Sequence, residues 1–215
     1  FAQQRLVVDL VSRRLPKSYG YDPLRDIQVI TPAKQGPLGT RELNRLLQGK
    51  LNPPERGKGE ATLMGRTLRE GDKVMQIRNN YDIIWQQPDG TAGTGIFNGD
   101  MGIIEMLDPG SKTIQVRFEE KLATYSFENQ DQLEHAYAVT VHKSQGSEFE
   151  AVVMPLERRH PKLHYRNLLY TAVTRARKLL IMTGQKETVY AMVQNNRRTL
   201  RYTNQKEMLQ EMCDE

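Results

Sequence analysis

The sequence has almost no cysteine and no long apolar run. Its 215 residues include one cysteine, Cys213, so neither a disulfide framework nor a cysteine-based metal site can form within one chain. No apolar stretch approaches the roughly 18 residues needed to span a bilayer. We therefore expect a cytoplasmic protein in a reducing compartment.

Patterns for metal binding and for cradling phosphates are also missing. The four histidines lack the spacing of a zinc site, because Pro161 separates the two that stand four residues apart, His160 and His164. No G-x-x-x-x-G-K-[ST] run occurs, and the loop from Gly36 to Gly39 has no lysine to hold a phosphate. No acidic Mg²⁺ motif follows a strand. We expect that this chain alone neither binds ATP tightly nor hydrolyses it.

The start of the chain has neither an initiating methionine nor a signal-peptide pattern. It begins at Phe1, and Asp9 interrupts the apolar run from Leu6 to Val11. We expect a piece of a longer protein, so that function is divided between this chain and a part outside it.

Positive charge is concentrated in one stretch. The net charge is +5, and residues 157–178 hold seven basic residues and one acid: Arg158, Arg159, Lys162, Arg166, Arg175, Arg177, Lys178 and Glu157. Residues 119–134 instead carry five acids and one lysine. Such a basic face fits a polyanionic partner, although a charge run can also be an ordinary solvated surface.

The central stretch of the chain is Ala136–Pro155, in which a polar loop separates two short apolar runs. The flanking runs have the length and β-branched content of buried strands. Within the loop, His142 and Lys143 can donate to phosphate oxygens, Gly146 permits close approach of a ligand, and Glu148 can accept from a ribose hydroxyl. The alternative is a solvated surface loop.

Strands near residues 27, 74, 138, 152 and 180 alternate with helical patterns over 1–15, 41–48, 165–177 and 186–194. This alternation predicts an α/β fold with a mostly parallel sheet. The Gly-containing loop 31–40 joins a strand to a helix, so it lies at the carboxyl edge where ligands bind. Thr40 is the expected N-cap, and Lys34 and Arg41 are placed to reach an anion; a purely structural turn is the alternative.

A change of pattern from Phe97 predicts a small β-barrel-like module. Three short strands are expected at 101–107, 113–118 and 122–127, with turn-like residues at 90–95 before them. We place an α/β domain at 1–96 and 134–200, the inserted module at 97–133, and a tail at 201–215.

Several stretches carry a family resemblance. Thr140-Val-His142-Lys-Ser-Gln-Gly146-Ser-Glu148-Phe149 resembles motif V of superfamily 1 helicases, and Leu169-Tyr170-Thr-Ala-Val-Thr174-Arg175-Ala-Arg177 resembles motif VI. The segment from Ile30 to Asn44 resembles the motif IV region of the RecD-like branch, as do Gly71-Asp-Lys-Val-Met-Gln and Phe97-Asn-Gly-Asp100. In order and extent, these stretches resemble the RecD-like superfamily 1B DNA helicases, the exodeoxyribonuclease V alpha-subunit family.

The resemblance implies a second RecA-like motor domain with an SH3-like insertion. ATP, with Mg²⁺, would be held mainly by a first motor domain of the same polypeptide. Arg175 matches the arginine that contacts the γ-phosphate, and either Lys34 or Arg41 could be a second contact. The resemblance implies nucleotide contacts at Gln145, Gly146, Glu148 and Tyr170, and contacts to single-stranded DNA at Asn80, Thr140, His142 and Lys143.

The function implied by the resemblance is ATP-dependent 5′-to-3′ DNA unwinding in recombination and repair, in a complex or alone. Because one loop carries residues for both ligands, a change at the phosphate is expected to alter the grip on DNA. A stand-alone nucleic-acid-binding module is the alternative. A nuclease is disfavoured, because the sequence shows no carboxylate cluster for metal-assisted cleavage.

Overall fold

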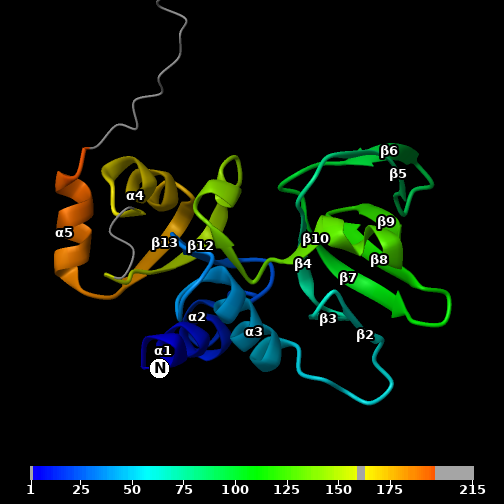
Figure 1. The fold of residues 1–215 in the computed structure, drawn as a ribbon, viewed down its shortest axis with the longest axis horizontal. Coiled ribbons are helices and arrows are strands. Elements are labelled where there is room, and N and C mark those ends of the chain that lie inside the picture. Colours follow the sequence, from blue (N-terminus) through cyan, green and yellow to red (C-terminus); the bar gives the residue numbers. More distant parts are fainter. Residues whose placement is uncertain (1, 159–162, 197–215) are drawn as a thin grey trace, which may run out of the picture.

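The chain folds into two lobes that lie beside each other (Figure 1). The computed structural model describes residues 2–158 and 163–196. Within these limits, we call residues 2–51 and 136–196 the α/β lobe and residues 58–135 the β lobe. Since the α/β lobe contains both the first and the last described segments, the β lobe is an insertion within it.

Four parallel strands form the sheet of the α/β lobe, in the order β11-β1-β12-β13. Their bounds are Ala138–Thr140 (β11), Ile27–Thr31 (β1), Phe149–Pro155 (β12) and Ala176–Thr183 (β13). In the shared register, Val29 pairs with Ala138 on one side and with Val153 on the other. Strands β1 and β11 are buried along their whole length, as expected of strands covered on both faces.

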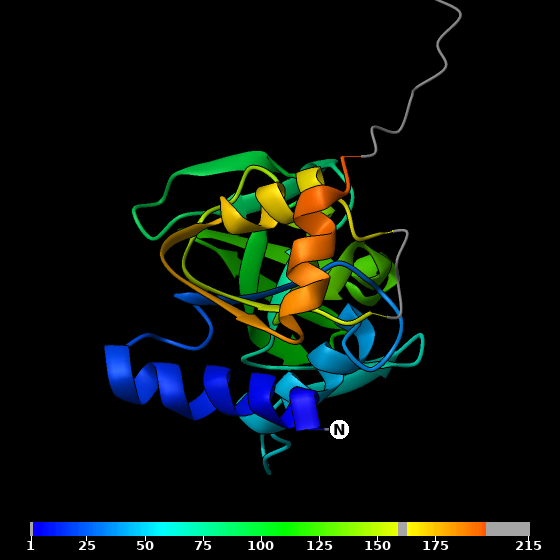
Figure 2. The same ribbon diagram turned by 90° about the vertical axis from the view of Figure 1, so that its left-hand side faces the viewer.

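Helices cover both faces of this sheet, which confirms the predicted architecture (Figures 1 and 2). Val29 and Val153 pack with the helices of the N-terminal half, whereas Ile30 and Met154 pack with those of the C-terminal half. The first set comprises α1 (Ala2–Asp9), a π-helical turn (Leu10–Arg14), α2 (Leu15–Tyr19) and α3 (Thr40–Leu51). The second comprises α4 (Arg166–Val173) and α5 (Lys186–Gln194). The described helices include none long and apolar enough to cross a membrane.

The first helical segment continues past Pro16, where the sequence predicted its end. The π-helical turn Leu10–Arg14 precedes the proline, and the backbone N–H of Leu15 bonds Leu10 O. A wider turn accommodates a residue that lacks a backbone donor. The segment ends instead at Gly20, whose φ of 71° places it in the left-handed region that glycine adopts without steric cost.

Two other predicted helix boundaries were wrong. Gly39 occupies the N-cap position of α3, and Thr40 is already helical. A Cβ at position 39 would lie 2.5 Å from Gln35 O, so only glycine fits this turn. Helix α4 ends at Val173, and Ala176, predicted to be helical, is the first residue of β13, where it pairs with Phe149.

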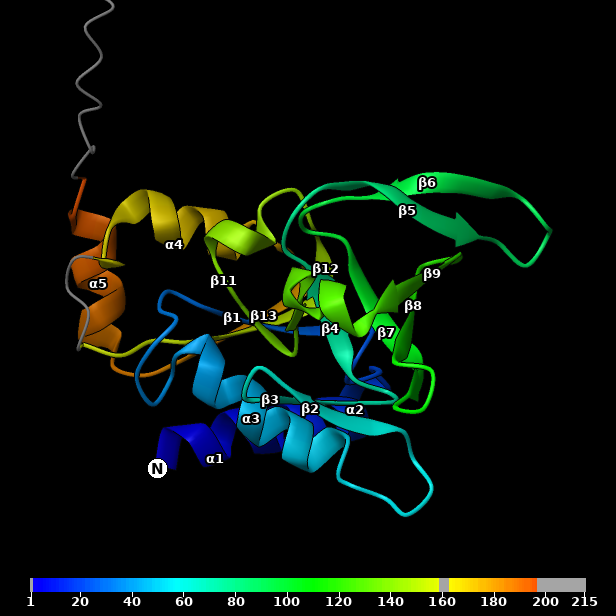
Figure 3. The same ribbon diagram turned by 45° about the vertical axis from the view of Figure 1, so that its right-hand side comes forward.

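A seven-stranded sheet forms the β lobe, in the order β10-β4-β7-β8-β9-β5-β6. Its strands are β4 (Lys73–Gln76), β5 (Asn80–Gln86), β6 (Ala92–Ile96), β7 (Met101–Asp108), β8 (Thr113–Phe118), β9 (Lys121–Ser126) and β10 (Leu133–His135). The hairpin of β2 (Glu60–Leu63) and β3 (Arg66–Arg69) lies beside it, and the 3₁₀ turn Phe127–Gln132 precedes β10. The hairpin of β5 and β6 projects from the lobe (Figure 3). Ile104, Ile114 and Tyr125 are among the buried residues of a separate core.

The strand near residue 74 was assigned to the wrong sheet. β4 pairs antiparallel with β7 and β10, although its four residues are buried like those of a parallel strand. Strands β5 and β6 also precede residue 97, so the sheet starts earlier than the expected insertion. Residues 90–95, predicted to be a turn, lie partly in β6, where Gly93 packs against Trp85: a Cβ there would lie 2.5 Å from the ring.

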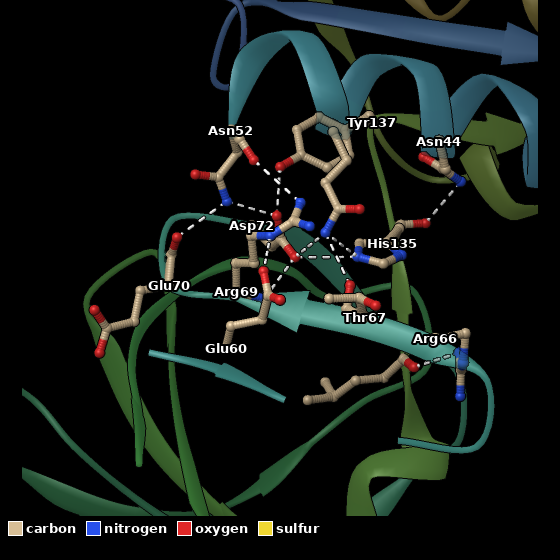
Figure 4. Close-up of polar contacts among 12 residues, drawn as sticks. Asn44, Asn52, Glu60, Arg66, Thr67, Arg69, Glu70, Asp72, His135 and Tyr137 are labelled. Atoms are coloured by element: carbon tan, nitrogen blue, oxygen red, sulfur yellow. Dashed lines mark hydrogen bonds and ion pairs between the residues drawn. The ribbon is translucent and has the colours of Figure 1, made fainter. Parts of the chain in front are cut away.

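A buried carboxylate joins the two lobes at Asp72 (Figure 4). Its Oδ2 accepts from Gln48 Nε2 at 2.7 Å and its Oδ1 from Asn52 Nδ2 at 2.6 Å, on α3 and the residue that follows it. Tyr137 Oη donates to Oδ1 at 2.8 Å, and His135 Nε2 lies 3.1 Å from Oδ2. Burial alone would raise the pKa of Asp72, but the hydrogen bond and electrostatic interaction with His135, together with the bonds from Asn52 and the backbone N–H of Arg69, outweigh it and hold the pKa below its ordinary value.

Candidate functional site

The loop 141–148 runs from the carboxyl ends of the parallel strands, which we call the carboxyl edge, to their amino ends, which we call the amino edge. It leaves β11 after Thr140, which is level with Thr31 at the carboxyl end of β1. It enters β12 at Phe149, six residues before Pro155, which the register places level with the end of β1. At ~3.3 Å per residue the two ends are about 20 Å apart along the strand direction. The site therefore consists of two groups at opposite edges.

The carboxyl-edge group surrounds an open groove of about 520 Å³. The groove is lined by Pro32, Ala33, Lys34, Gln35, Thr140, His142, Lys143 and Leu163. Lys34 and His142 are exposed, and His142 begins a 3₁₀ turn, His142–Ser144, that follows β11 closely. Two segments far apart in sequence thus bring three of the predicted DNA contacts together with Lys34.

An ion pair anchors this group to the β lobe. Lys143 Nζ lies 2.6 Å from Glu134 Oε2. Burial raises the pKa of Glu134, but the hydrogen bond from Lys143, together with the charges of Lys143, Lys34 and Arg66, outweighs it and lowers the pKa. Glu134 is thus a carboxylate that holds Lys143 at the groove.

Thr140 and His142 differ in how much surface they offer. Thr140 is buried, and its Oγ1 accepts a long bond of 3.4 Å from the backbone N–H of Lys143, so it shapes the turn. The imidazole of exposed His142 has Nε2 3.5 Å from Tyr165 Oη. The ligand-facing donors of the groove are therefore His142, Lys143 and Lys34.

The amino-edge group is organised around Arg175, which follows α4. Its Nε donates to Thr171 O at 3.1 Å, its Nη1 to Ser147 O at 3.0 Å, and its Nη2 to Thr174 Oγ1 at 3.1 Å. The backbone closes the same unit, because Phe149 N donates to Arg175 O at 2.8 Å. A guanidinium has five N–H donors, so two are left after these three bonds. The side chain is therefore held in place and keeps two N–H groups that can bind a ligand.

Acidic and basic side chains pair beside Arg175. Arg177 Nε lies 3.1 Å from Glu148 Oε2, and Lys178 Nζ lies 2.7 Å from Glu150 Oε2. The predicted nucleotide contact Glu148 is therefore occupied by an arginine that the sequence placed in motif VI but assigned no role. Both side chains are more than half exposed, so water screens this pair and a ligand can replace it.

The remaining predicted nucleotide contacts are exposed. Gln145 and Gly146 lie in the crossing loop, where Gly146 has a φ of 85° and a Cβ at its position would meet no other atom within 4 Å. Tyr170 on α4 is 69% exposed. These three positions are open to a ligand.

The three residues predicted to contact phosphate are not brought together. Lys34 and Arg41 are both exposed at the ends of the β1–α3 loop, where Arg41 N donates to Lys34 O at 3.2 Å. This loop follows the carboxyl end of β1, whereas Arg175 precedes the amino end of β13. Lys34 shares its groove with the predicted DNA contacts instead.

Asn80 lies in the β lobe and uses its side chain internally. Its Oδ1 accepts from the backbone N–H groups of Asp82 and Ile83, both at 3.1 Å, and its Nδ2 donates to Gln132 Oε1 at 3.0 Å. These bonds fix the start of β5. The structure therefore gives Asn80 a local role, apart from both edge groups.

Sequence reasoning missed two residues of these groups. Glu134 was counted only as part of an acidic stretch, although it holds Lys143. Ser147 supplies a backbone carbonyl to Arg175, and a main-chain acceptor leaves no signal in residue type. The nine-residue separation of Glu134 and Lys143 spans two strands, so no helical or strand spacing indicated their contact.

Comparisons with known proteins match both lobes. Residues 43–118 match the family described as the ATP-dependent RecD-like DNA helicase SH3 domain, which covers most of the β lobe. Residues 135–183 match the UvrD-like helicase C-terminal domain, which covers β11 through β13. The chain thus combines part of a helicase C-terminal domain with an SH3-like domain that precedes the matched part in sequence.

Similar curated proteins include RecD-like helicases. The chain is 35% identical over 158 residues to the ATP-dependent RecD2 DNA helicase of Deinococcus radiodurans, covering 74% of this chain and 20% of that protein. It is 26% identical to the RecBCD enzyme subunit RecD of Buchnera aphidicola subsp. Schizaphis graminum, covering 79% and 26%. The chain carries the SH3 domain of the RecD-like DNA helicase family, and it spans about a fifth to a quarter of the length of these two relatives, to which it is similar.

One solved structure supports the fold. The crystal structure of a Pif1 helicase from Bacteroides in complex with ADP-AlF3 and ssDNA matches with a TM-score of 0.50 at 16% identity. The match covers 98% of this chain and 49% of that one. It shows that the arrangement of both lobes is one that a helicase adopts.

Proposed function

We propose that this chain is the C-terminal motor domain of an ATP-dependent DNA helicase. The parent protein translocates 5′ to 3′ on single-stranded DNA and acts in recombination and repair. Support comes from the names of the relatives, an ATP-dependent RecD2 DNA helicase and a RecBCD subunit, and from the similar Pif1 helicase, whose crystal structure is a complex with ADP-AlF3 and ssDNA. The α/β lobe is the second RecA-like domain, and residues 58–135 are the SH3-like insertion.

The observation that carries this proposal is the attachment of Arg175 to the crossing loop. Its bonds to Ser147 O and Thr171 O hold a half-buried guanidinium at the amino edge with two donors left over. A planar, permanently charged donor stabilises charge that develops on a phosphoryl group during transfer. Arg175 therefore serves the nucleotide, with Glu148, Gly146, Gln145 and Tyr170 beside it.

The carboxyl-edge group serves the DNA. Lys34, His142 and Lys143 present donors to one open groove, which suits contacts to a phosphate backbone without readout of sequence. We assign Lys34 to this DNA contact because it shares the groove. Arg41 stays the alternative second contact to nucleotide.

The described part of the chain shows no cluster of metal ligands. The described residues include no group of three His, Cys, Asp or Glu side chains that could hold a metal ion. We propose that a Mg²⁺ ion bound with ATP takes its protein ligands from the first motor domain, and that this chain's part is to supply Arg175 and the DNA groove.

The test is ATP turnover by the parent protein with and without single-stranded DNA. Arg175→Ala should lower the DNA-stimulated kcat by about 10³-fold, the scale of a lost arginine finger, while the Kd for DNA stays within about twofold. Arg177→Ala is the matched control, because its side chain is exposed and paired with Glu148. Unchanged turnover in a folded Arg175→Ala variant would instead favour a non-catalytic nucleic-acid-binding module.

A further inference from the structure

Lys73 of the β lobe reaches into the amino edge of the α/β sheet. It is the first residue of β4 and is 5% exposed. Its Nζ donates to Gln28 Oε1 at 2.9 Å and lies 3.5 Å from Ile27 O, both on β1. The same ammonium lies 5.9 Å from the centroid of the Phe149 ring. One side chain of the insertion thus contacts the starts of two strands of the motor domain.

Phe149 connects this contact to the nucleotide side. It follows Glu148 directly, and its backbone N–H donates to Arg175 O at 2.8 Å. Arg175 in turn donates to Ser147 O, two residues before Phe149. The ring under the Lys73 ammonium therefore belongs to the short segment that fixes both the main chain and the side chain of Arg175.

The position of Lys73 is itself fixed. The preceding residue, Asp72, is bonded to Gln48 and Asn52, and Lys73 O accepts from Ala136 N at 2.8 Å. Burial lowers the pKa of Lys73 to about 8, opposed in part by Asp22 and Asp26. Burying an ammonium costs free energy of folding. An apolar side chain would hold the two lobes together equally well if contact between them were its whole role.

We propose that Lys73 is a positioning residue for ATP hydrolysis: from the SH3-like insertion it holds Phe149, and through Phe149 it sets the position of Arg175. The insertion then acts on the nucleotide side of the motor. This proposal rests on the proposed role of Arg175.

The experiment uses the parent protein with Lys73→Met, which nearly keeps the length of the side chain and removes the charge. The kcat for DNA-stimulated ATP hydrolysis should fall about tenfold, because small displacements of a catalytic group are costly. The Kd for single-stranded DNA should stay within about twofold. In an Arg175→Ala background the same substitution should have no further effect, since Lys73 acts through that arginine.

Lys121→Met is the matched control. Lys121 also lies over an aromatic ring, that of Trp85 at 4.9 Å, but both residues belong to the β lobe, so kcat should not change. An unchanged kcat in Lys73→Met, or an equal loss with and without Arg175, would overturn the proposal. If Lys73→Met does not fold, Phe149→Leu is measured in both backgrounds with the same outcomes. An Arg175→Ala variant with full turnover would instead refute the proposed function itself.

Discussion

The two edges of the parallel sheet present their basic side chains in opposite ways. At the carboxyl edge, Lys34 and His142 are exposed around an open groove. At the amino edge, Arg175 is bonded to two backbone carbonyls, and Arg177 is paired with Glu148. Accessible hydrogen-bond donors suit a mobile polyanion, whereas a fixed guanidinium suits charge that develops at one place.

One loop joins the exposed basic side chains of the carboxyl edge to the bonded arginine of the amino edge. Residues 141–148 begin in the groove and end beside the carbonyl that holds Arg175. A shift of the loop at one edge therefore has a direct covalent route to the other. Two ligands can be handled about 20 Å apart by one short loop, and substitutions at each edge should separate their roles.

The largest expected effect separates the edges by DNA affinity. Lys34→Ala combined with Lys143→Ala should weaken binding of single-stranded DNA by about 10- to 100-fold at low salt. The slope of log K against log salt should fall by about 1.4, since each lost phosphate contact on a single strand contributes ~0.7. Fluorescence anisotropy across a salt series measures both.

Lys178→Ala is the control for that pair, because Lys178 is a lysine of the amino edge that is bonded to Glu150 at 2.7 Å. It should leave both the affinity and the slope unchanged. Equal losses from the two edges would abolish the distinction between them.

An intermediate effect concerns the support of the carboxyl edge, since Asp72 fixes α3 and β10. The folded pKa of Asp72 lies below its ordinary value of 3.8, so its contribution to stability is fully present above that value and is lost as the pH falls through the lower, folded pKa. Asp72→Asn should destabilise the chain by about 1–3 kcal/mol at pH 7. The gap to wild type should narrow below about pH 4.

Urea unfolding at pH 7 and pH 3 tests this expectation. Asp131→Asn serves as the control, because Asp131 pairs with Arg78 on the surface at 2.9 Å and surface pairs contribute little. A gap that stays constant between the two pH values would show that the charge of Asp72 has no part in holding the lobes.

The smallest expected effect concerns Asn80. Its side chain is bonded to Asp82, Ile83 and Gln132, so Asn80→Ala should cost about 1 kcal/mol of stability. The affinity for single-stranded DNA should change by less than about twofold. A tenfold loss of affinity with normal stability would restore the role that the sequence predicted and add the β lobe to the DNA site.

Residue patterns were sufficient where local chemistry decides the structure. The buried strands at 27–31 and 149–155 stand out as apolar runs, and the last helix was predicted with the bounds Lys186–Gln194 that the structure has. The resemblance assigned Arg175 and Glu148 to the same ligand, and the two residues lie at the same edge because those that precede β12 and β13 are neighbours in a parallel pair.

The patterns failed where pairing between distant segments decides. β4 is as buried as a parallel strand, and nothing in its four residues tells which of two sheets it joins. No pattern indicated that Asp72 and Lys73 are buried, since the groups that compensate their charges, on Gln28, Gln48 and His135, are far away in sequence. The separation of Lys34 from Arg175 also required the register of the sheet.

The most direct test of coupling between the edges is DNA affinity as a function of nucleotide. The Kd of the parent protein for single-stranded DNA is measured without nucleotide and with a non-hydrolysable ATP analogue, in wild type and in Arg175→Ala. A nucleotide that moves the loop between states with different grip on DNA also changes the DNA affinity. We expect a difference of about fivefold or more in wild type.

In Arg175→Ala that difference should shrink to less than about twofold, while the Kd without nucleotide stays that of wild type. A variant that keeps the full nucleotide-dependent difference would contradict the account, because the two edges would then communicate without the arginine that holds the loop at the amino edge.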